Sequence, residues 1–409
     1  MSEWKKVKLG DYCEITSSKR CLASVRSKNG IPFFCSKEII CLDKGEDFEP
    51  TDFIPEELYN DIKAKYGVPT GGDLLLTTRG TNGIPYIYKP SDKFYFADGN
   101  LSWFKNFGKE LSPQYLYYWF KSPLGIHEVD AISKGTAQKA VPIDGLRRIV
   151  LLTPSLHTQN RIVEILSRYD SLIENYQKQI KLLEEAAQRL YKEWFVDLRF
   201  PGHENTKIVD GVPEGWEKKT IADVCTNISS GSTPSRSNKA YWENGTIKWV
   251  KTKELQDGWI LDTEEYISQE GYNSSSTKMF PVNTILMAIY ASPTLGRLGI
   301  LSTDCCCNQA ALGLIADENI ISWQWLFWKL YELRDEFNAI ARGAGQQNIS
   351  GIVVKNKEII IPDKGVIDGF TSVVSKMFEQ QKSLSSQLRL LTEARDRLLP
   401  ELMNGEMEI

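Results

Sequence analysis

Residues 135–154 read GTAQKAVPIDGLRRIVLLTP, and residues 343–362 read GAGQQNISGIVVKNKEIIIP. The two stretches keep three positions at a constant offset of 208 residues (343 − 135): Gly135 with Gly343, Gln138 with Gln346, and Pro154 with Pro362. The same offset relates Leu182, Leu183, Glu185, Ala186, Arg189 and Leu190 to Leu390, Leu391, Glu393, Ala394, Arg397 and Leu398. A constant offset over this length is hard to obtain by chance, so we infer an internal duplication.

The repeat weakens towards the start of each half. Residues 3–13, EWKKVKLGDYC, resemble residues 215–225, GWEKKTIADVC, and IPFFCSKEI resembles IKWVKTKEL. The offset drifts from 212 at Trp4 and Trp216 to 216 at Lys37 and Lys253, so insertions and deletions lie inside the front part of each half. This pattern indicates variable loops on a repeated frame.

The composition is that of a globular protein. The chain has 409 residues, of which 42% are apolar and 25% charged, and this length predicts two to four compact units. No apolar run approaches the roughly 18 residues of a membrane span, and the N-terminus has no apolar signal region. We therefore expect a cytoplasmic protein without a membrane partner.

The formal net charge of −4 argues against a protein that binds nucleic acid over its whole surface. Local stretches differ from this average, since SSKRCLASVRSK, GSTPSRSNKAYW and ISKGTAQK carry positive charge without nearby acids. Such patches can bind phosphates on an acidic protein.

Motifs for catalysis and metal binding are absent from the sequence. The eight cysteines form no C-x-x-C pair, and Cys305, Cys306 and Cys307 alternate faces if they lie on a strand, so we expect buried free thiols. The three histidines form no H-E-x-x-H motif, and no G-x-x-x-x-G-K-[ST] or strand-to-helix G-x-G-x-x-G motif occurs. We expect no catalytic residue and no metal ligand.

Apolar or small residues recur from Ile162 onward at alternating steps of four and three, which is typical of a heptad seam. The first seam comprises Ile162, Leu166, Tyr169, Ile173, Tyr176, Ile180, Leu183, Ala187, Leu190 and Trp194. The second seam, at the same 208-residue offset, comprises Phe370, Val374, Met377, Gln381, Leu384, Leu388, Leu391, Arg395, Leu398 and Leu402. Pro400 is placed to stop the second helix.

A helix from about His157 to Val196 would be roughly 60 Å long, too long to pack on every side within one small domain. Antiparallel pairing buries both seams, whereas an amphipathic helix on each domain's own core leaves most of each seam without a partner. We predict an α+β protein in which two pseudo-symmetric domains are separated by two long antiparallel coiled-coil helices. The predicted segments are residues 1–155 and 215–362 for the two front domains, 156–200 and 363–409 for the helices, and 201–214 for a linker rich in Gly, Pro and charge.

Loops rich in Ser, Thr, Asn, Gly, Lys and Arg join the strand-like runs of each front domain. Hydroxyls and backbone N–H groups can position a nucleic-acid backbone, and Arg, Lys, Asn and Gln can read bases. For each position the alternative is a solvated loop residue or a structural turn. The candidate DNA contacts are Lys37, Thr78, Arg79, Thr81, Asn82, Lys134, Gly135, Thr136 and Gln138 in the first half, and Ser232, Thr233, Ser235, Arg236, Lys253, Arg342, Gly343, Gln346 and Gln347 in the second. The tryptophans could stack on extruded bases, but the WQWLFW cluster is more simply core or interface.

Three sequence features together match a known family: the G-x-x-Q pattern before a strand, PSLHTQNRIVEILSRYDSLI at the start of the first helix, and RDRLLPELMNGEMEI at the end of the chain. With two variable domains, each followed by a repeated helix, the chain resembles the specificity subunit of a Type I restriction-modification system. The second helix opening, IPDKGVIDGFTSVV, lacks the Gln-rich start of the first.

The resemblance implies that each front domain is a target-recognition domain that reads one half of a split site in double-stranded DNA. It implies that the helices set the gap and dock two methyltransferase subunits, that S-adenosylmethionine binds those subunits, and that ATP and Mg²⁺ bind separate restriction subunits. No cofactor and no enzymatic activity are then expected on this chain, and the site should be asymmetric because the loops differ. The alternatives are a recognition subunit of another restriction-modification type and a non-catalytic coiled-coil scaffold without DNA binding.

Overall fold

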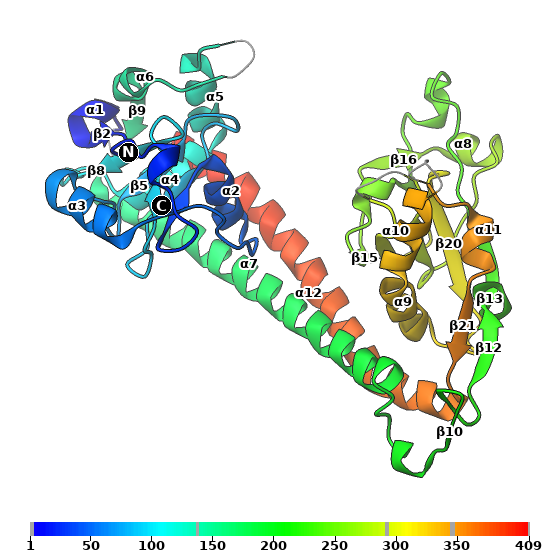
Figure 1. The fold of residues 1–409 in the computed structure, drawn as a ribbon. Helices are drawn as coiled ribbons and strands as arrows, with labels where there is room; N and C mark the ends of the chain where they lie inside the picture. Colours follow the sequence, from blue (N-terminus) through cyan, green and yellow to red (C-terminus); the bar gives the residue numbers. More distant parts are fainter. Residues whose placement is uncertain (1–3, 136–138, 291–293, 344–347, 408–409) are drawn as a thin grey trace. The chain divides into compact units, whose positions relative to one another are not determined.

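The computed structural model describes residues 4–135, 139–290, 294–343 and 348–407. The chain forms two compact units (Figure 1). Unit 1 comprises Met1–Glu174 and Leu390–Ile409, and unit 2 comprises Asn175–Arg389. Both units mix helices and strands, so the predicted α+β class is confirmed.

Unit 1 is built on three sheets. A four-stranded sheet has the order β2-β8-β5-β6, a three-stranded sheet has the order β4-β3-β7, and β1 pairs with β9. All strand pairs are antiparallel except β3 with β7. The strands are β1 (Lys5–Lys8), β2 (Glu14–Thr16), β3 (Ile31–Phe34), β4 (Phe53–Ile54), β5 (Leu74–Thr77), β6 (Pro85–Ile87), β7 (Tyr95–Phe96), β8 (Leu101–Lys105) and β9 (Val150–Thr153).

Unit 2 repeats this topology. Its sheets with the orders β13-β20-β17-β18-β15, β16-β14-β19 and β12-β21 give each strand of unit 1 a counterpart, and β15 and the small β10-β11 sheet are additions. The strands are β12 (Glu217–Thr220), β13 (Cys225–Ser230), β14 (Ile247–Val250), β15 (Gly258–Ile260), β16 (Glu265–Ile267), β17 (Ile285–Ala288), β18 (Leu298–Leu301), β19 (Cys306–Cys307), β20 (Ala311–Ala316) and β21 (Glu358–Ile361). The duplication inferred from the offset therefore extends through the whole order of strands.

The short helices repeat as well. Ser112 caps α4 and Ser322 caps α9, and each side chain accepts a hydrogen bond from the backbone N–H three residues later. Both helices are aromatic and largely buried, so they fill the core of their unit. The helices of unit 1 are α1 (Leu9–Tyr12), α2 (Ser36–Lys44), α3 (Glu56–Tyr66), α4 (Pro113–Lys121), α5 (Pro123–Ile132) and α6 (Ile143–Arg148), and those of unit 2 are α8 (Gln269–Asn273), α9 (Trp323–Glu332), α10 (Arg334–Gly343) and α11 (Gly351–Lys355).

Two long helices, α7 (Leu156–Tyr191) and α12 (Lys364–Asn404), contribute to both units. In unit 1 the start of α7 packs near the end of α12, since Arg395 Nη1 donates to Asp170 Oδ1 over 2.9 Å. In unit 2 the end of α7 packs on the start of α12, with the Tyr191 and Phe370 rings 6.1 Å apart. The helices therefore run antiparallel in each unit, as predicted. All the predicted seam residues are buried or half-buried.

The predicted stop at Pro400 is wrong, because α12 continues to Asn404 with the proline inside it. A proline so close to the helix end removes one backbone hydrogen bond, which the packing of Leu402 and Met403 in the core outweighs. The left-handed Gly405 (φ 73°) follows the last helical residue. The segment predicted as a linker also holds structure, since β10 (Ile208–Val209) and β11 (Val212–Pro213) form a hairpin.

The two long helices start differently. The amide of Gln159, which is fully buried, accepts a hydrogen bond from Ser112 N–H and donates to the carbonyls of Glu110 and Pro154. At the 208-residue offset α12 has Ile367, which is equally buried and packs in the apolar core of unit 2. The Gln-rich start of α7 thus ties the helix to unit 1 by hydrogen bonds, whereas α12 uses apolar contact.

All eight cysteines are free, but the predicted burial holds only in part, because Cys35, Cys41 and Cys225 are half-buried. Cys305 and Cys307 belong to one apolar cluster and Cys306 to another, so the three side chains alternate faces. None of the described helices combines the length and apolar character that crossing a bilayer requires.

Candidate nucleic-acid interface

Three groups of candidate residues in unit 1 come together around the β5–β6 loop. Ser36, at the start of α2 and next to Lys37, donates its hydroxyl to the carbonyl of Arg79 over 2.9 Å. Ala140 forms backbone bridges with both Arg79 and Lys134. Lys37, the loop from Arg79 to Asn82, and the Lys134–Gly135 segment are therefore neighbours, although the sequence separates them by up to 97 residues (134 − 37).

The β5–β6 loop is held from both sides. Asn82 donates its side-chain amide to the carbonyl of Lys139, and the backbone N–H of Gly83 donates to Thr77. Gly80 has φ +83°, a left-handed conformation that disfavours other residues at this turn. Thr78 is buried, with 3% exposure, so it has no surface to offer DNA and we leave it out of the interface.

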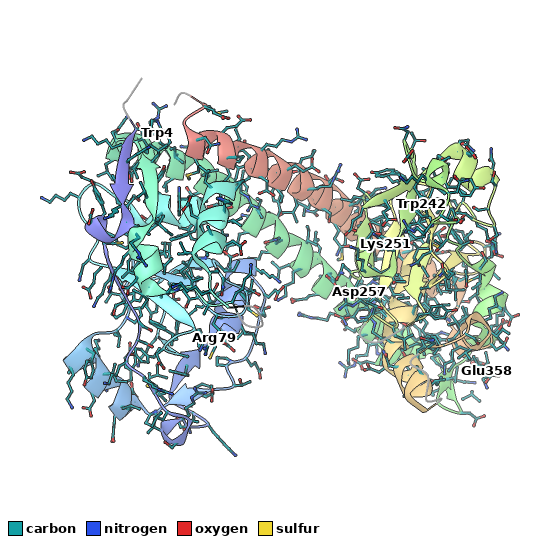
Figure 2. The ribbon with its side chains drawn as sticks, turned by 90° about the horizontal axis from the view of Figure 1, so that it is seen from above. Trp4, Arg79, Trp242, Lys251, Asp257 and Glu358 are labelled. Atoms are coloured by element: carbon teal, nitrogen blue, oxygen red, sulfur yellow. The ribbon has the colours of Figure 1, made fainter. Side chains whose placement is uncertain are left out.

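The side chains of Lys37, Arg79 and Lys134 are exposed, and none of them forms an ion pair in the described part of the chain. Arg79 is labelled in Figure 2. Three unpaired cations close together in unit 1 make a local positive potential, which attracts phosphates.

In unit 2 the candidate loop Ser232–Arg236 follows β13 and is pinned at its start. Trp249 Nε1 donates to the carbonyl of Ser232 over 2.9 Å, and the Ser232 hydroxyl lies 2.8 Å from that of Ser276. Thr233 donates to Gln309. A side chain at Gly231 would collide with the backbone of Cys307, so only glycine allows this close approach.

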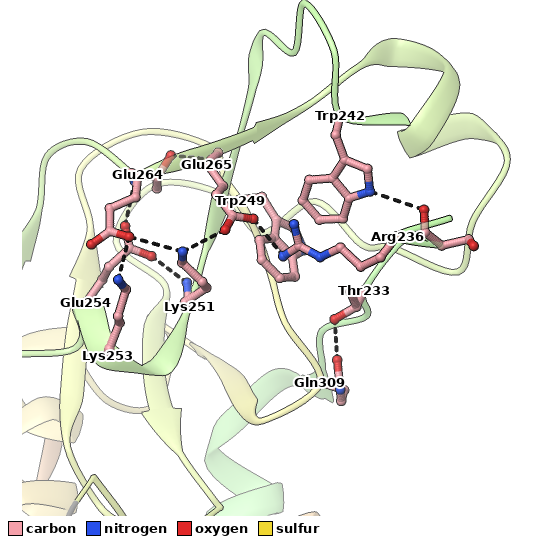
Figure 3. A network of polar contacts seen from close by, with 12 residues as sticks. Thr233, Arg236, Trp242, Trp249, Lys251, Lys253, Glu254, Glu264, Glu265 and Gln309 are labelled. Atoms are coloured by element: carbon pink, nitrogen blue, oxygen red, sulfur yellow. Dashed lines mark hydrogen bonds and ion pairs between the residues drawn. The ribbon is translucent and has the colours of Figure 1, made fainter. Parts of the chain in front are cut away.

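Arg236 of this loop, together with Lys251 and Lys253 after β14, lies in a network of ion pairs (Figure 3). Arg236 Nη2 is 2.6 Å from Glu265 Oε2, and Lys253 Nζ is 2.6 Å from Glu264 Oε2. Lys251 bridges the two glutamates at 3.0 and 2.7 Å. Arg236 and Lys253, predicted separately as DNA contacts, thus belong to one cluster.

The network shifts the pKa values of Glu264, Glu265 and Lys251. Hydrogen bonds from Lys253 and Lys251 lower the pKa of Glu264. Burial raises the pKa of Glu265, but hydrogen bonds from Lys251 and Arg236 outweigh it, and the net pKa is lowered. A hydrogen bond to Glu265 raises the pKa of Lys251. Glu264, Glu265 and Lys251 therefore stay charged at neutral pH.

The expectation that three stretches carry positive charge without nearby acids is wrong. Each stretch meets an acid: Arg26 pairs with Asp52, Lys139 with Asp130, and Arg236 with Glu265. Asp130 lies two residues before ISKGTAQK in the sequence, whereas the fold brings Asp52 and Glu265 from 26 and 29 positions away (52 − 26, 265 − 236).

The remaining candidate residues fall at the limits of the structure. Thr136, Gln138, Gln346 and Gln347 lie outside the described residues. Arg342 and Gly343 are the last residues of α10, and the Arg342 side chain is outside the description too. Their proposed contacts with DNA stay predictions.

Sequence analysis missed the acidic members of the cluster, Glu264 and Glu265, and the arginine at position 26. These residues could be found from the repeat of β3 and β4 as β14 and β16. That repeat can be aligned only when the pairing register of the strands is known. In the WQWLFW cluster, Trp325 and Trp328 are buried, as the core interpretation predicts, and Trp323 is half-buried; Trp103, Trp119 and Trp249 are buried as well. No group of His, Cys, Asp and Glu suited to holding a metal ion occurs among the described residues.

The model of the Type I restriction modification DNA specificity domain matches residues 1–185 and 213–384, which include both candidate interfaces. The chain belongs to this family. It is similar to the HindI specificity subunit of Haemophilus influenzae, with 25% identity over 483 residues that cover 100% of both chains. It is also similar to the MjaIX specificity subunit of Methanocaldococcus jannaschii, with 28% identity over 304 residues that cover 72% of this chain and 69% of the relative.

The crystal structure of a Type I restriction-modification S subunit from M. genitalium has the same fold, with a TM-score of 0.66, 15% identity and coverage of 98% and 96% of the two chains. Family membership makes this chain a Type I specificity subunit, a component without catalysis of its own that recognises a DNA target and assembles with other subunits.

Proposed function

We propose that unit 1 and unit 2 each read one half of a split, asymmetric sequence in double-stranded DNA. One observation carries this proposal: the two units share the same three-sheet frame, strand for strand, but present different loop chemistry on it. A shared frame suits two equivalent contacts with DNA, as symmetric dimers make on palindromes. Different loops suit two different half-sites.

The loops differ in charge as well as in sequence. The unit 1 loops carry the exposed Lys37, Arg79 and Lys134 without ion pairs among the described residues, and they suit phosphate contact. The unit 2 loops carry Arg236 and Lys253 balanced by Glu265 and Glu264, and they suit directed hydrogen bonds more than charge attraction. The two half-sites should therefore differ in sequence.

We further propose that the long helices dock two copies of a methyltransferase subunit. The residues that repeat identically include Leu182, Glu185 and Arg189 on α7, which share one face at steps of three and four and are all exposed. Their matches Leu390, Glu393 and Arg397 on α12 are exposed too. Leu182 and Leu390 have 55% and 57% of their surface exposed, which is unusual for leucines that a duplication has kept.

One copy of this repeated helix face lies in each unit, so two copies of the same partner can bind in equivalent ways. Restriction subunits would join through the methyltransferases. S-adenosylmethionine would bind the methyltransferase subunits, and ATP and Mg²⁺ would bind the restriction subunits.

Single-molecule methylation sequencing of host DNA tests the split site directly. The comparison is between cells with the gene for this chain intact and cells with it disrupted, both keeping the methyltransferase gene. Loss of one split, asymmetric methylation motif on disruption is the expected result, and restoring the gene should restore the motif. A continuous or palindromic motif would contradict the division of the site between the units, and an unchanged methylome would contradict the proposal as a whole.

A further inference from the structure

An arginine lies at matching places in the two units. In unit 1, Phe33 of β3 pairs in parallel with Tyr95 of β7, and its N–H donates to the carbonyl of Asp52 just before β4. In unit 2, Trp249 of β14 pairs in parallel with Cys306 of β19 and stands opposite Glu265 at the start of β16. Phe33 therefore corresponds to Trp249, and Asp52 corresponds to Glu265.

Each of these aromatic and acidic pairs holds one guanidinium. Arg26 Nη1 donates to Asp52 Oδ2 over 2.5 Å, and its guanidinium lies 4.7 Å from the centre of the Phe33 ring. Arg236 Nη2 lies 2.6 Å from Glu265 Oε2, and its guanidinium lies 5.0 Å from the centre of the Trp249 ring.

Trp242 adds a second ring in unit 2, 3.6 Å from the Arg236 guanidinium (Figure 3). In both units the acid and the ring on β14 or β3 fix the plane and the direction of the arginine.

The match is spatial and does not follow from the sequence spacing. Arg26 precedes its ring by 7 residues (33 − 26), whereas Arg236 precedes its ring by 13 (249 − 236). Loops of different length thus bring an arginine to the same point on the repeated frame. A solvated loop residue would not be expected at the same place in both units. The shared position therefore indicates that the arginine has a role there.

Arg26 and Arg236 are more exposed than Arg334, which forms an ion pair of structural type in unit 2. Arg334 of unit 2 also pairs with an acid, Asp257, and lies over a ring, but only 20% of its side chain is exposed. The side chains of Arg26 and Arg236 are 30% and 52% exposed, while the Phe33 and Trp249 rings are buried and Trp242 is half-buried. The guanidinium therefore covers the ring and keeps an outward edge.

We infer that Arg26 and Arg236 are matched base-reading residues, one for each half of the DNA site. A guanidinium has five N–H donors, and Glu265 is the only ion-pair partner of the Arg236 side chain among the described residues. The outward donors are aimed by the ring and the acid, so they can meet an acceptor-rich base edge such as O6 and N7 of guanine.

The acid also cancels the charge of the arginine, so the pair adds little to the salt-dependent attraction of phosphates. The pair instead fixes the direction of the arginine N–H donors, and hydrogen bonds to base edges require such directed donors. This inference rests on the proposed function, because it assigns a residue to each half-site.

The test uses the whole chain assembled with its methyltransferase subunits. The variants are Arg26→Lys and Arg236→Lys, which keep the positive charge but lose the planar, forked set of guanidinium donors. Arg334→Lys serves as the control, because Arg334 forms a less exposed ion pair. Binding to a library of duplexes with randomised half-sites is read by sequencing, which gives the base preference at each position. Thermal unfolding of each variant shows whether it is folded.

We expect Arg26→Lys to relax preference at positions of one half-site, Arg236→Lys to relax it only at the other, and Arg334→Lys to change neither. The loss of discrimination should be on the order of tenfold at the affected base, with an unchanged dependence on salt. Equal weakening on every sequence, or unchanged preferences in both variants, would overturn the inference. A wild-type complex without any split preference would instead overturn the proposed function, so the two failures are distinguishable.

Discussion

The unpaired cations of unit 1 should dominate the salt dependence of DNA binding. The perturbation is the triple variant Lys37→Ala, Arg79→Ala and Lys134→Ala, compared with the single variant Lys253→Ala. The Ser36 hydroxyl holds this loop by donating to the backbone carbonyl of Arg79 and not to its side chain, so the triple variant should keep its fold. Lys253 must leave Glu264, 2.6 Å away, before it can meet a phosphate.

The magnitude follows from counterion release. Each phosphate neutralised by a cation contributes about 0.9 to the slope of log K against log salt concentration, so three contacts contribute about 2.7. Between 50 and 200 mM salt, the wild type should then lose about 40-fold more affinity than the triple variant. For the paired Lys253 the change in slope should be well below 0.9.

The assay is fluorescence anisotropy of the assembled complex with a labelled duplex of arbitrary sequence, titrated at several salt concentrations. A non-specific duplex suffices, because phosphate contacts do not depend on sequence. An unchanged slope in the triple variant would refute the placement of these three side chains at the DNA. A drop as large in Lys253→Ala would refute the reasoning that ion pairing withholds a cation from phosphates.

Three further predictions concern stability, assembly and the thiols. Gln159→Leu should lower the free energy of unfolding by about 2–4 kcal/mol, because Ser112 N–H and two carbonyls lose a buried partner; an unchanged midpoint in urea would contradict this. Leu182→Glu and Leu390→Glu should each leave stability nearly unchanged, since both leucines are exposed, but each should remove one methyltransferase from the complex in analytical ultracentrifugation. Retention of both copies in the double variant would exclude this helix face. Burial raises the pKa of the Cys13 and Cys306 thiols from 9.0 to about 12, so the folded state keeps protons that the unfolded state releases. Stability should therefore fall as pH rises from 9 to 12, and alkylation of the native protein at pH 8 should be slow; rapid labelling would contradict the burial.

Sequence analysis anticipated the parts of the fold that rest on periodicity. The steps of four and three along α7 and α12 mark their buried faces, and the predicted start near His157 lies one residue from the observed Leu156. The stop at Pro400 was misplaced, because a proline near a helix end costs one hydrogen bond and the packing of Leu402 compensates for it. Local sequence rules describe a helix well until tertiary contacts compete with them.

The candidate interface was anticipated only in part. Arg236 and Lys253 were found from their loop and their repeat, but Glu264 and Glu265, which balance them, were not. Glu265 begins β16 and Glu264 directly precedes it, so their distance from the cations depends on how β14 and β16 pair. Arg26 was missed for the same reason, since its match with Arg236 is a match of strand register and not of spacing.

The sequence by itself determined the duplication, the two long helices and which of their apolar residues form the buried seams. These features follow from residue spacing along one chain. Tertiary structure decided which charges stand alone and which are paired. Lys37, Arg79 and Lys134 come together through backbone contacts between distant segments, while Arg26 and Arg236 each meet an acid and a ring across neighbouring strands. Electrostatic interactions depend on distance in space, and the pairing of strands sets those distances.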